Sequence, residues 1–199
     1  MDFRDVVRKR RMVRAFSPEP VPQEVLDRVL DAGRRAPSAG NSQGWAFVVL
    51  AGPDETARYW DVTFPPARRS GFKWQTMFDA PVLVIPLASA QPYLERYREP
   101  DKLATGLGAG PDAWPVPYWT VDTSFAAMLM LLAAVDEGLG AVFFGIFSNE
   151  RALLDALEVP AGWQPIGTIA LGWPEADEPG TSARRRRRPF AEVVHRGRW

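Results

Sequence analysis

The alternation of apolar and polar positions along the chain predicts helices interleaved with short buried strands. Apolar residues recur at helical intervals in four segments, namely 2–9, 22–32, 121–137 and 151–157. Continuous apolar runs, which are typical of buried strands, occupy four others, namely 46–51, 82–88, 141–147 and 166–171. This order predicts a sheet of about four or five strands with helices on both faces.

Two of these segments carry features that refine the prediction. The 121–137 helix is apolar almost all round, as in helices that are buried on several sides, often within an oligomer. Asp122 and Ser124 are expected to cap its start. Pro86 interrupts the 82–88 run, and because proline has no N–H, it predicts a sheet edge or a bulge.

Residues 59–118 differ from the rest because aromatic residues are scattered there among Pro, Gly and Arg. The aromatic content argues against disorder, and long irregular segments in a compact domain are usually functional. Two interpretations remain open. The aromatic side chains fill the core, or they form a variable lid or substrate-pocket insertion that stacks a planar ligand. We expect a single domain over 1–199 in either case.

Composition excludes several classes of chemistry. A chain of 199 residues buries ~70% of its unfolded surface and needs no disulfides. It has no cysteine and one histidine, His195, which excludes thiol catalysis, cysteine-bound metals and histidine clusters. Any redox chemistry must come from a cofactor. Its 24 basic and 24 acidic residues balance, so no general attraction to nucleic acid or membrane is expected.

The chain is also expected to be soluble and cytoplasmic. Charged residues follow Met1 immediately, without the apolar core of a signal peptide. The longest apolar stretch, 126–135, is too short to span a bilayer.

Charged and polar side chains that could bind a ligand are concentrated near the N-terminus. Arg10, Arg11 and Arg14 place three guanidinium groups within five residues. The Gly/Ser/Asn-rich turn at 36–44 follows, closed by Trp45. Fixed cations and such a turn suit a phosphate and a polar planar ring, the outline of a flavin mononucleotide (FMN) site. A surface helix end followed by an ordinary loop has the same residue types.

The order and spacing of these residues resemble the nitroreductase family. Residues 10–16 match its Arg-[Arg/His]-Ser-x-[Arg/Lys]-x-Phe pattern, and residues 37–45 match Pro-Ser-x-x-Asn-x-Gln-Pro-Trp. The likeness continues to the C-terminus. Two positions depart from the patterns: Met12 replaces the serine, which removes a hydroxyl contact, and Gly44 replaces the proline before Trp45. A backbone N–H at Met12 can still serve the cofactor.

The resemblance implies an α+β fold. It is a three-layer α/β/α arrangement with a central mixed, mainly antiparallel sheet, assembled as an intertwined homodimer. Each flavin site is then built from two subunits, and the tail, residues 175–199, docks on the partner.

The resemblance also implies a set of cofactor-binding residues: Arg10, Arg11, Met12, Arg14, Pro37, Ser38, Asn41, Phe143, Phe144, Gly145, Arg185 and Arg187. Arg10 and Arg187 match phosphate-binding positions, and Arg14 matches the cation beside the ribityl chain and pyrimidine edge. Arg11 suits a surface ion pair equally well. The backbone of 143–145 matches the segment laid across the flavin ring, and the 37–41 turn matches one that reaches in from the partner.

Two further segments have open interpretations. Lys73, Gln75 and Thr76 match polar family contacts only loosely, and a surface role suits them equally. The run 184–188 is all arginine; alone, such a run is more often solvated or bound to nucleic acid. The Pro-Phe-x-x-Val-Val sequence that follows favours a docked tail, with Arg186 able to substitute for Arg185.

The implied function is an FMN-dependent oxidoreductase that passes hydride from NADH or NADPH to an electron-poor acceptor, such as a nitroaromatic or a quinone, by a ping-pong mechanism. The cofactor carries the bond chemistry, and no catalytic side chain or metal is expected. A flavin-binding or storage protein is one alternative. Another is a same-fold flavoenzyme of the dehydrogenase, dehalogenase or flavin-cleaving type. Neither nucleic acid nor membrane is an expected partner.

Overall fold

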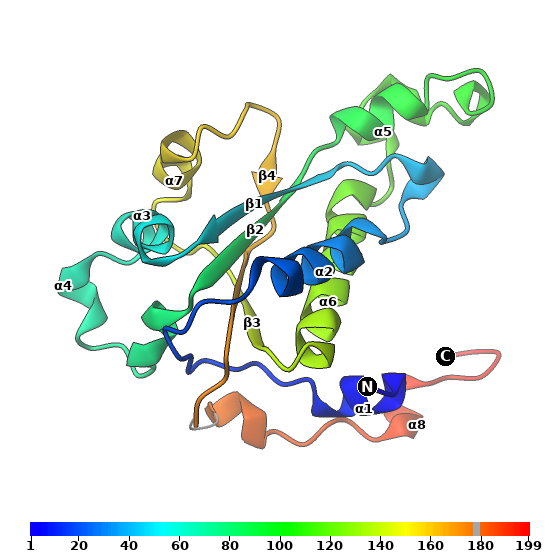
Figure 1. Ribbon diagram of the computed structural model, residues 1–199. Coiled ribbons are helices and arrows are strands. Elements are labelled where there is room, and N and C mark those ends of the chain that lie inside the picture. The colour runs from blue at the N-terminus through cyan, green and yellow to red at the C-terminus, as the bar shows by residue number, and fades with distance from the viewer. Residues whose placement is uncertain (177–179) are drawn as a thin grey trace.

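The computed structural model describes residues 1–176 and 180–199. A five-stranded sheet has the main order β1-β2-β5-β3 (Figure 1). The short strand β4 pairs with the C-terminal end of β2, whereas β5 pairs with its N-terminal part. The strands are β1 Trp45–Ala51, β2 Val82–Ala88, β3 Gly140–Phe144, β4 Gln164–Pro165 and β5 Thr168–Gly172. Each pairing between these strands is antiparallel, which confirms the α+β class and the mainly antiparallel sheet.

Helices cover both faces of this sheet (Figure 1). The α-helices are α1 Phe3–Lys9, α2 Gln23–Arg34, α3 Pro53–Thr63, α4 Pro66–Arg69, α5 Gln91–Arg96, α6 Tyr118–Asp136, α7 Glu150–Ala156 and α8 Phe190–Val193. The 3₁₀ turns are η1 Ala39–Asn41, η2 Gln75–Asp79, η3 Leu103–Thr105, η4 Leu107–Ala109, η5 Pro111–Ala113 and η6 Thr181–Arg184. One face of the sheet packs on α2 and α6, and the other packs on α3 and α7.

β2 shows how the sequence produces these three layers. Successive side chains of a strand point to opposite faces. Val82 and Val84 therefore join the core under α2 and α6, whereas Leu83, Ile85 and Leu87 join the core under α3 and α7. A strand covered on both faces needs a continuous apolar run, which is what the 82–88 segment supplies.

The edge position predicted from Pro86 is wrong, because β2 is flanked by β1 on one side and by β5 and β4 on the other. The Pro86 carbonyl accepts a hydrogen bond from Ile166 N–H, between the last β5 partner, Val84, and the first β4 partner, Leu87. N–H and C=O of one strand residue point to the same side. The missing N–H therefore faces an interruption in pairing, close to the predicted bulge.

α6 begins three residues before the predicted helix. Its Ala126, Met130 and Ala134 are fully buried, and α2 approaches closely because a Cβ on Gly33 would lie 2.7 Å from Met130 Cγ. By length and composition α6 would suffice to cross a membrane, but it packs on α2 and the sheet as a core helix. Its outer face leaves Phe125 and Met128 47% and 45% exposed.

β2 divides the 59–118 region into two packed parts. The first, before β2, includes the buried Trp60. The second forms a lobe around Tyr93 and Trp114, both buried, which extends beyond the sheet at α5 (Figure 1). Core filling therefore describes these aromatic residues. A lid function for other parts of the region stays a prediction.

Candidate functional site

A cavity of about 350 Å³ lies between α3, the segment that leads into β2, and the end of β3. Its wall is mainly aromatic, formed by Tyr59, Trp60, Phe64, Phe72, Phe78, Phe144 and Phe147. Cationic groups enter from Arg14 and Arg68. Its size and its apolar lining with few polar groups are typical of small-molecule sites.

The N-terminal segment places Arg14 at this cavity. Val13 is buried, and its N–H donates to the Ala141 carbonyl at 2.9 Å, which fixes the segment beside β3. Phe16, also buried, bridges to Pro174. The Arg14 side chain between these anchors donates to the Met12 carbonyl at 3.2 Å. Met12 thus contributes a backbone acceptor where the family pattern has a serine hydroxyl.

The two neighbouring arginines do not line this cavity. Arg10 is half-buried at the C-terminal end of α1, where its N–H donates to the Val6 carbonyl. Arg11 is exposed and borders a separate cavity of about 90 Å³. Of the three cations predicted here, the structure brings Arg14 alone to the aromatic cavity.

The end of β3 supplies the opposite side of the cavity. Phe144 and Gly145 line it, whereas Phe143 packs into the core on the other face of the sheet, because strand residues alternate. A Cβ on Gly145 would lie 2.9 Å from the Phe147 ring. The absence of a side chain at Gly145 therefore leaves room for the Phe147 ring, which packs closely against the Gly145 backbone.

Trp60 and Tyr59 make a rigid floor for the cavity. The Trp60 indole stacks on the Phe144 ring with 5.8 Å between centroids and a 5° interplanar angle. Its buried Nε1 has no hydrogen-bond partner within the described part of the chain, and the rings of Tyr59 and Phe78 meet it edge to face at 5.0 Å. Burial raises the pKa of Tyr59 to about 12, so this ring is neutral at physiological pH.

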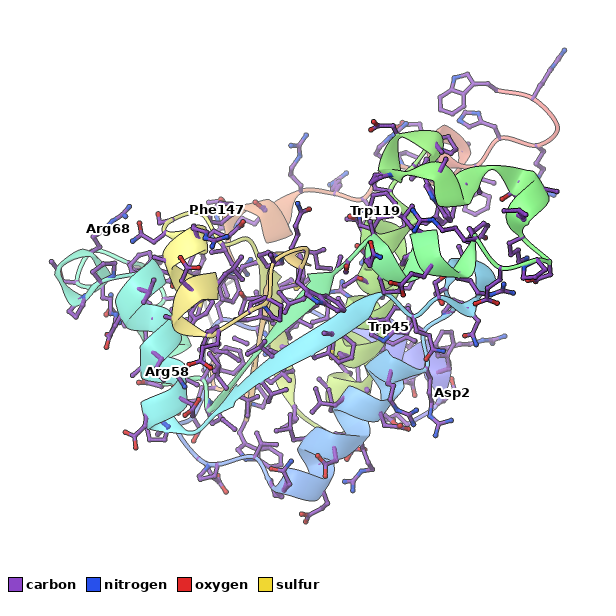
Figure 2. All side chains as sticks on the ribbon, turned by 90° about the horizontal axis from the view of Figure 1, so that it is seen from above. Asp2, Trp45, Arg58, Arg68, Trp119 and Phe147 are labelled. Carbon is purple, nitrogen blue, oxygen red and sulfur yellow. The ribbon has the colours of Figure 1, made fainter. Side chains whose placement is uncertain are left out.

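The turn that carries Pro37, Ser38 and Asn41 lies elsewhere in the same chain. It precedes Trp45 at the start of β1, and none of its residues lines the cavity. Figure 2 shows Trp45 well separated from Phe147 and Arg68. A single chain therefore does not unite the two predicted halves of the site.

The tail positions Arg185 and Arg187 also lie outside the cavity lining. Residues 184–199 are all exposed, and residues 177–179 of the predicted tail fall outside the described residues. A Cβ on Gly180 would lie 3.4 Å from the Trp74 ring. The described part of the tail thus starts beside an indole that the Arg14 guanidinium also contacts. Docking of the tail on a partner stays a prediction.

The remaining polar residues divide between the cavity and the loop around it. Arg68, which no motif singled out, lines the cavity and lies over the Phe64 ring. Gln75 instead donates to the carbonyls of Arg69 and Phe72 and so holds the loop together. Lys73 lies 5.5 Å from the Trp74 ring. In the sequence, the one signal for Arg68 is its place in an aromatic-rich segment that also contains scattered arginines.

The predicted capping role of Asp122 is wrong. α6 starts at Tyr118, so Asp122 lies in its second turn. It is 2% exposed and accepts hydrogen bonds from Ala39 N–H and the Tyr93 hydroxyl, both at 2.8 Å. Partners so distant in sequence leave no local pattern. Ser124 likewise lies inside the helix and donates to the Thr120 carbonyl.

Comparison with known proteins identifies the family. Residues 7–173 match the model of the Nitroreductase family. The chain belongs to the nitroreductase family. Membership places this nitroreductase-family protein among the oxidoreductases and confirms the fold expected from the N-terminal motifs.

Individual relatives of this nitroreductase-family protein are diverse. A Methanothermobacter thermautotrophicus protein described as an NADH dehydrogenase/NAD(P)H nitroreductase is 29% identical over 91% of this chain and 81% of its own. The 5,6-dimethylbenzimidazole synthase of Rhodospirillum rubrum is 31% identical over 85% and 81%. The structure of an FMN-dependent nitroreductase from Clostridium difficile superposes with a TM-score of 0.68 at 19% identity, covering 98% of each chain, and shows a shared fold.

Proposed function

We propose that this protein is an FMN-dependent oxidoreductase that passes hydride from NADH or NADPH to an electron-poor acceptor, such as a nitroaromatic or a quinone, in a ping-pong sequence. The observation that carries the proposal is the convergence of Arg14, Phe144 and Gly145 on one aromatic cavity. These residues come from two segments that the resemblance assigns independently to the flavin. The names of the relatives support both the nicotinamide donor and the flavin.

The cavity residues fit a planar, electron-accepting ring. Phe64, Phe72 and Phe147 supply apolar contact, and Gly145, which has no side chain, allows the Phe147 ring to pack against its backbone. Arg14 supplies a positive charge at a part-buried position, where screening by water is weaker than at the surface. When bound, FMN would supply the two-electron redox chemistry that links the nicotinamide donor to the acceptor.

The chain's own residues bind and bias that group. Arg14 favours the anionic reduced form by electrostatic attraction. Aromatic side chains exclude water from the reacting faces. Arg10 and Arg187 are assigned to the phosphate end, where guanidinium forks pair with oxygens, and Arg11 and Arg185 are assigned to the cofactor as further cations. Met12 and Phe143 contribute backbone groups, and Pro37, Ser38 and Asn41 reach in from the partner of a homodimer.

The decisive experiment is the visible spectrum of the purified protein, with mass identification of the released chromophore. We expect flavin absorption, FMN in the extract, and oxidation of NADH or NADPH that depends on menadione or nitrofurazone. Initial-rate patterns with parallel lines would support the ping-pong sequence. A colourless protein that stays colourless after incubation with FMN would overturn the proposal. A yellow protein without turnover would instead favour the storage alternative.

A second candidate is a same-fold flavoenzyme of the flavin-cleaving type. The name of the R. rubrum relative gives 5,6-dimethylbenzimidazole as its product, and this compound contains the same dimethylbenzene ring as flavin. Its test is incubation of the protein with reduced FMN and oxygen, followed by mass spectrometry. Formation of 5,6-dimethylbenzimidazole would support this candidate, and intact FMN with rapid menadione reduction would support the first.

A further inference from the structure

The turn before β1 is held in a strained backbone conformation. Asn41 and Gln43 have φ angles of 56° and 51°, in the left-handed region that residues with side chains rarely adopt, although asparagine tolerates it better than glutamine. Gly40, at 62°, adopts the same region without steric cost. Strain of this kind persists only where the surrounding structure imposes it, and it gathers at functional positions. The contacts that impose it here are therefore informative.

One anchor of the turn is the buried carboxylate of Asp122. Its Oδ2 accepts a hydrogen bond from the Ala39 N–H, at the start of η1, and another from the Tyr93 hydroxyl, both at 2.8 Å. Asp122 is 2% exposed, so few water molecules can replace these bonds. The Asp122 carboxylate thus links α6, on which it lies, to the Ala39 N–H of the turn and to Tyr93 of α5.

Tyr93 completes this anchor. It is fully buried, and a Cβ on Gly44 would lie 2.3 Å from its ring. The Tyr93 ring therefore occupies the space beside Gly44, the position where the family pattern has proline. Burial, and to a smaller extent the hydrogen bond to Asp122, raises the pKa of Tyr93. The Tyr93 hydroxyl therefore keeps its proton at neutral pH and donates a hydrogen bond to the carboxylate.

A further contact braces the turn from the lobe. Arg96 donates from Nε to the Gly40 carbonyl at 3.0 Å, and Asp101 holds its guanidinium from the other side. Pro37 and Asn41 remain exposed above these contacts, and Ser38 is half-buried. The anchored turn thus presents to the outside the residues assigned to a neighbouring subunit's site.

We propose that Asp122 and Tyr93 are positioning residues that hold the 37–43 turn in the shape in which Ser38 and Asn41 contact the cofactor bound by the partner subunit. This inference rests on the proposed function. Loss of the carboxylate leaves the buried Tyr93 hydroxyl and the part-buried Ala39 N–H without this acceptor, and the turn relaxes toward unstrained backbone angles. The affinity for FMN falls as a result, although Asp122 itself does not touch the cofactor.

The first test measures equilibrium binding of FMN by flavin fluorescence. Asp122→Ala is expected to raise the Kd for FMN about tenfold, a loss typical of a hydrogen bond to a charged group. Asp122→Asn keeps an acceptor and Tyr93→Phe keeps the bond to Ala39, so both should lose less. Ser124→Ala, an exposed position on the same helix, is the matched control and should bind like wild type.

Mixed dimers separate positioning from a general effect on folding. A subunit with Asp122→Ala is paired, through different affinity tags, with a subunit carrying Arg14→Ala. One site of this dimer combines an intact Arg14 with an intact turn, so we expect half of the sites to bind FMN with wild-type Kd. Neither variant homodimer should contain such a site. Absence of wild-type sites in the mixed dimer would overturn the inference.

The outcomes also separate this inference from the proposed function. If wild type does not bind FMN, the proposed function is wrong and the inference falls with it. If wild type binds FMN and Asp122→Ala binds equally tightly, the inference alone is overturned. Should Asp122→Ala fail to show a cooperative thermal transition, Asp122→Asn and Tyr93→Phe decide the question by the same measurements, with Asp122→Asn in the mixed dimer.

Discussion

The Arg14 guanidinium carbon lies 5.0 Å from the centre of the Trp74 ring. An arginine over an indole gains about 1 kcal/mol from the attraction between cation and ring, which restrains the guanidinium at the cavity. Gly180 also lies against this indole. Trp74 therefore joins the N-terminal segment, the loop before β2 and the start of the tail.

Arg14 should tune the reduction potential of bound FMN. Replacement by glutamine removes a positive charge that favours the reduced anion, a loss of about 1 kcal/mol at a part-exposed position. For a two-electron couple this corresponds to a potential about 20 mV more negative. Equilibration with a reference dye during slow reduction measures the change. Arg4→Gln, at an exposed position on α1, is the control, and an equal shift in both variants would contradict the assignment.

Arg187 should act on the phosphate end alone. Arg187→Ala is expected to raise the Kd for FMN about tenfold, because a charge-assisted bond to phosphate is lost. Binding of riboflavin, which has no phosphate, should not change. Titration of each apoprotein with both ligands tests this, with Arg184→Ala as the matched control. Equal weakening of FMN and riboflavin would show that Arg187 acts through the fold of the tail.

The outer face of α6 should be a subunit interface. Phe125→Glu places a charge on a large exposed apolar residue and is expected to convert the dimer to monomer in analytical ultracentrifugation. Ala152→Glu, on the exposed surface of α7, should leave the dimer intact. For the wild type, the thermal midpoint should rise with protein concentration. A midpoint that does not depend on concentration would count against an obligate dimer.

The Arg28–Glu137 ion pair between α2 and the end of α6 should stabilise the fold at neutral pH and lose this contribution in acid. Arg28 donates twice to Glu137, at 2.8 and 2.7 Å, and this contact lowers the pKa of Glu137. A carboxyl group whose pKa is lowered by folding stabilises the fold at pH values above its ordinary pKa. This contribution is lost as the pH falls through the folded-state pKa.

The Arg28→Ala variant should therefore melt below wild type at pH 7, and the difference should shrink toward zero as Glu137 becomes protonated. Calorimetry between pH 3 and pH 7 measures this. Arg58→Ala, whose partner Glu55 is on its own helix, serves as the control. A difference in Tm that stays constant over this range would show that Arg28 acts by packing.

Local patterns were sufficient to predict most of the elements. The apolar runs at 46–51 and 82–88 correspond to β1 and β2 within one residue, because each strand is buried and bounded by polar or turn residues. Pro86 was misplaced at an edge because the break in pairing opposite it is made by Ile166 and the short β4. That arrangement depends on long-range pairing that no local rule contains.

The candidate site was predictable only in part for the same reason. Motif spacing identified Arg14, Phe144 and Gly145, which the fold brings together. It could not show that Phe143 points away, since the register of β3 decides this. It also missed the bond from Ala39 to Asp122, whose positions are separated by 83 residues. Tertiary contacts, rather than propensity, determine both.

The exposed C-terminal segment makes a subunit that is not yet assembled sensitive to proteolysis. Arg184 to Arg187 offer consecutive trypsin sites that are exposed in an isolated subunit, whereas a segment docked on another molecule resists digestion. The rate at which trypsin cleaves this segment would therefore measure the fraction of subunits that are not yet assembled.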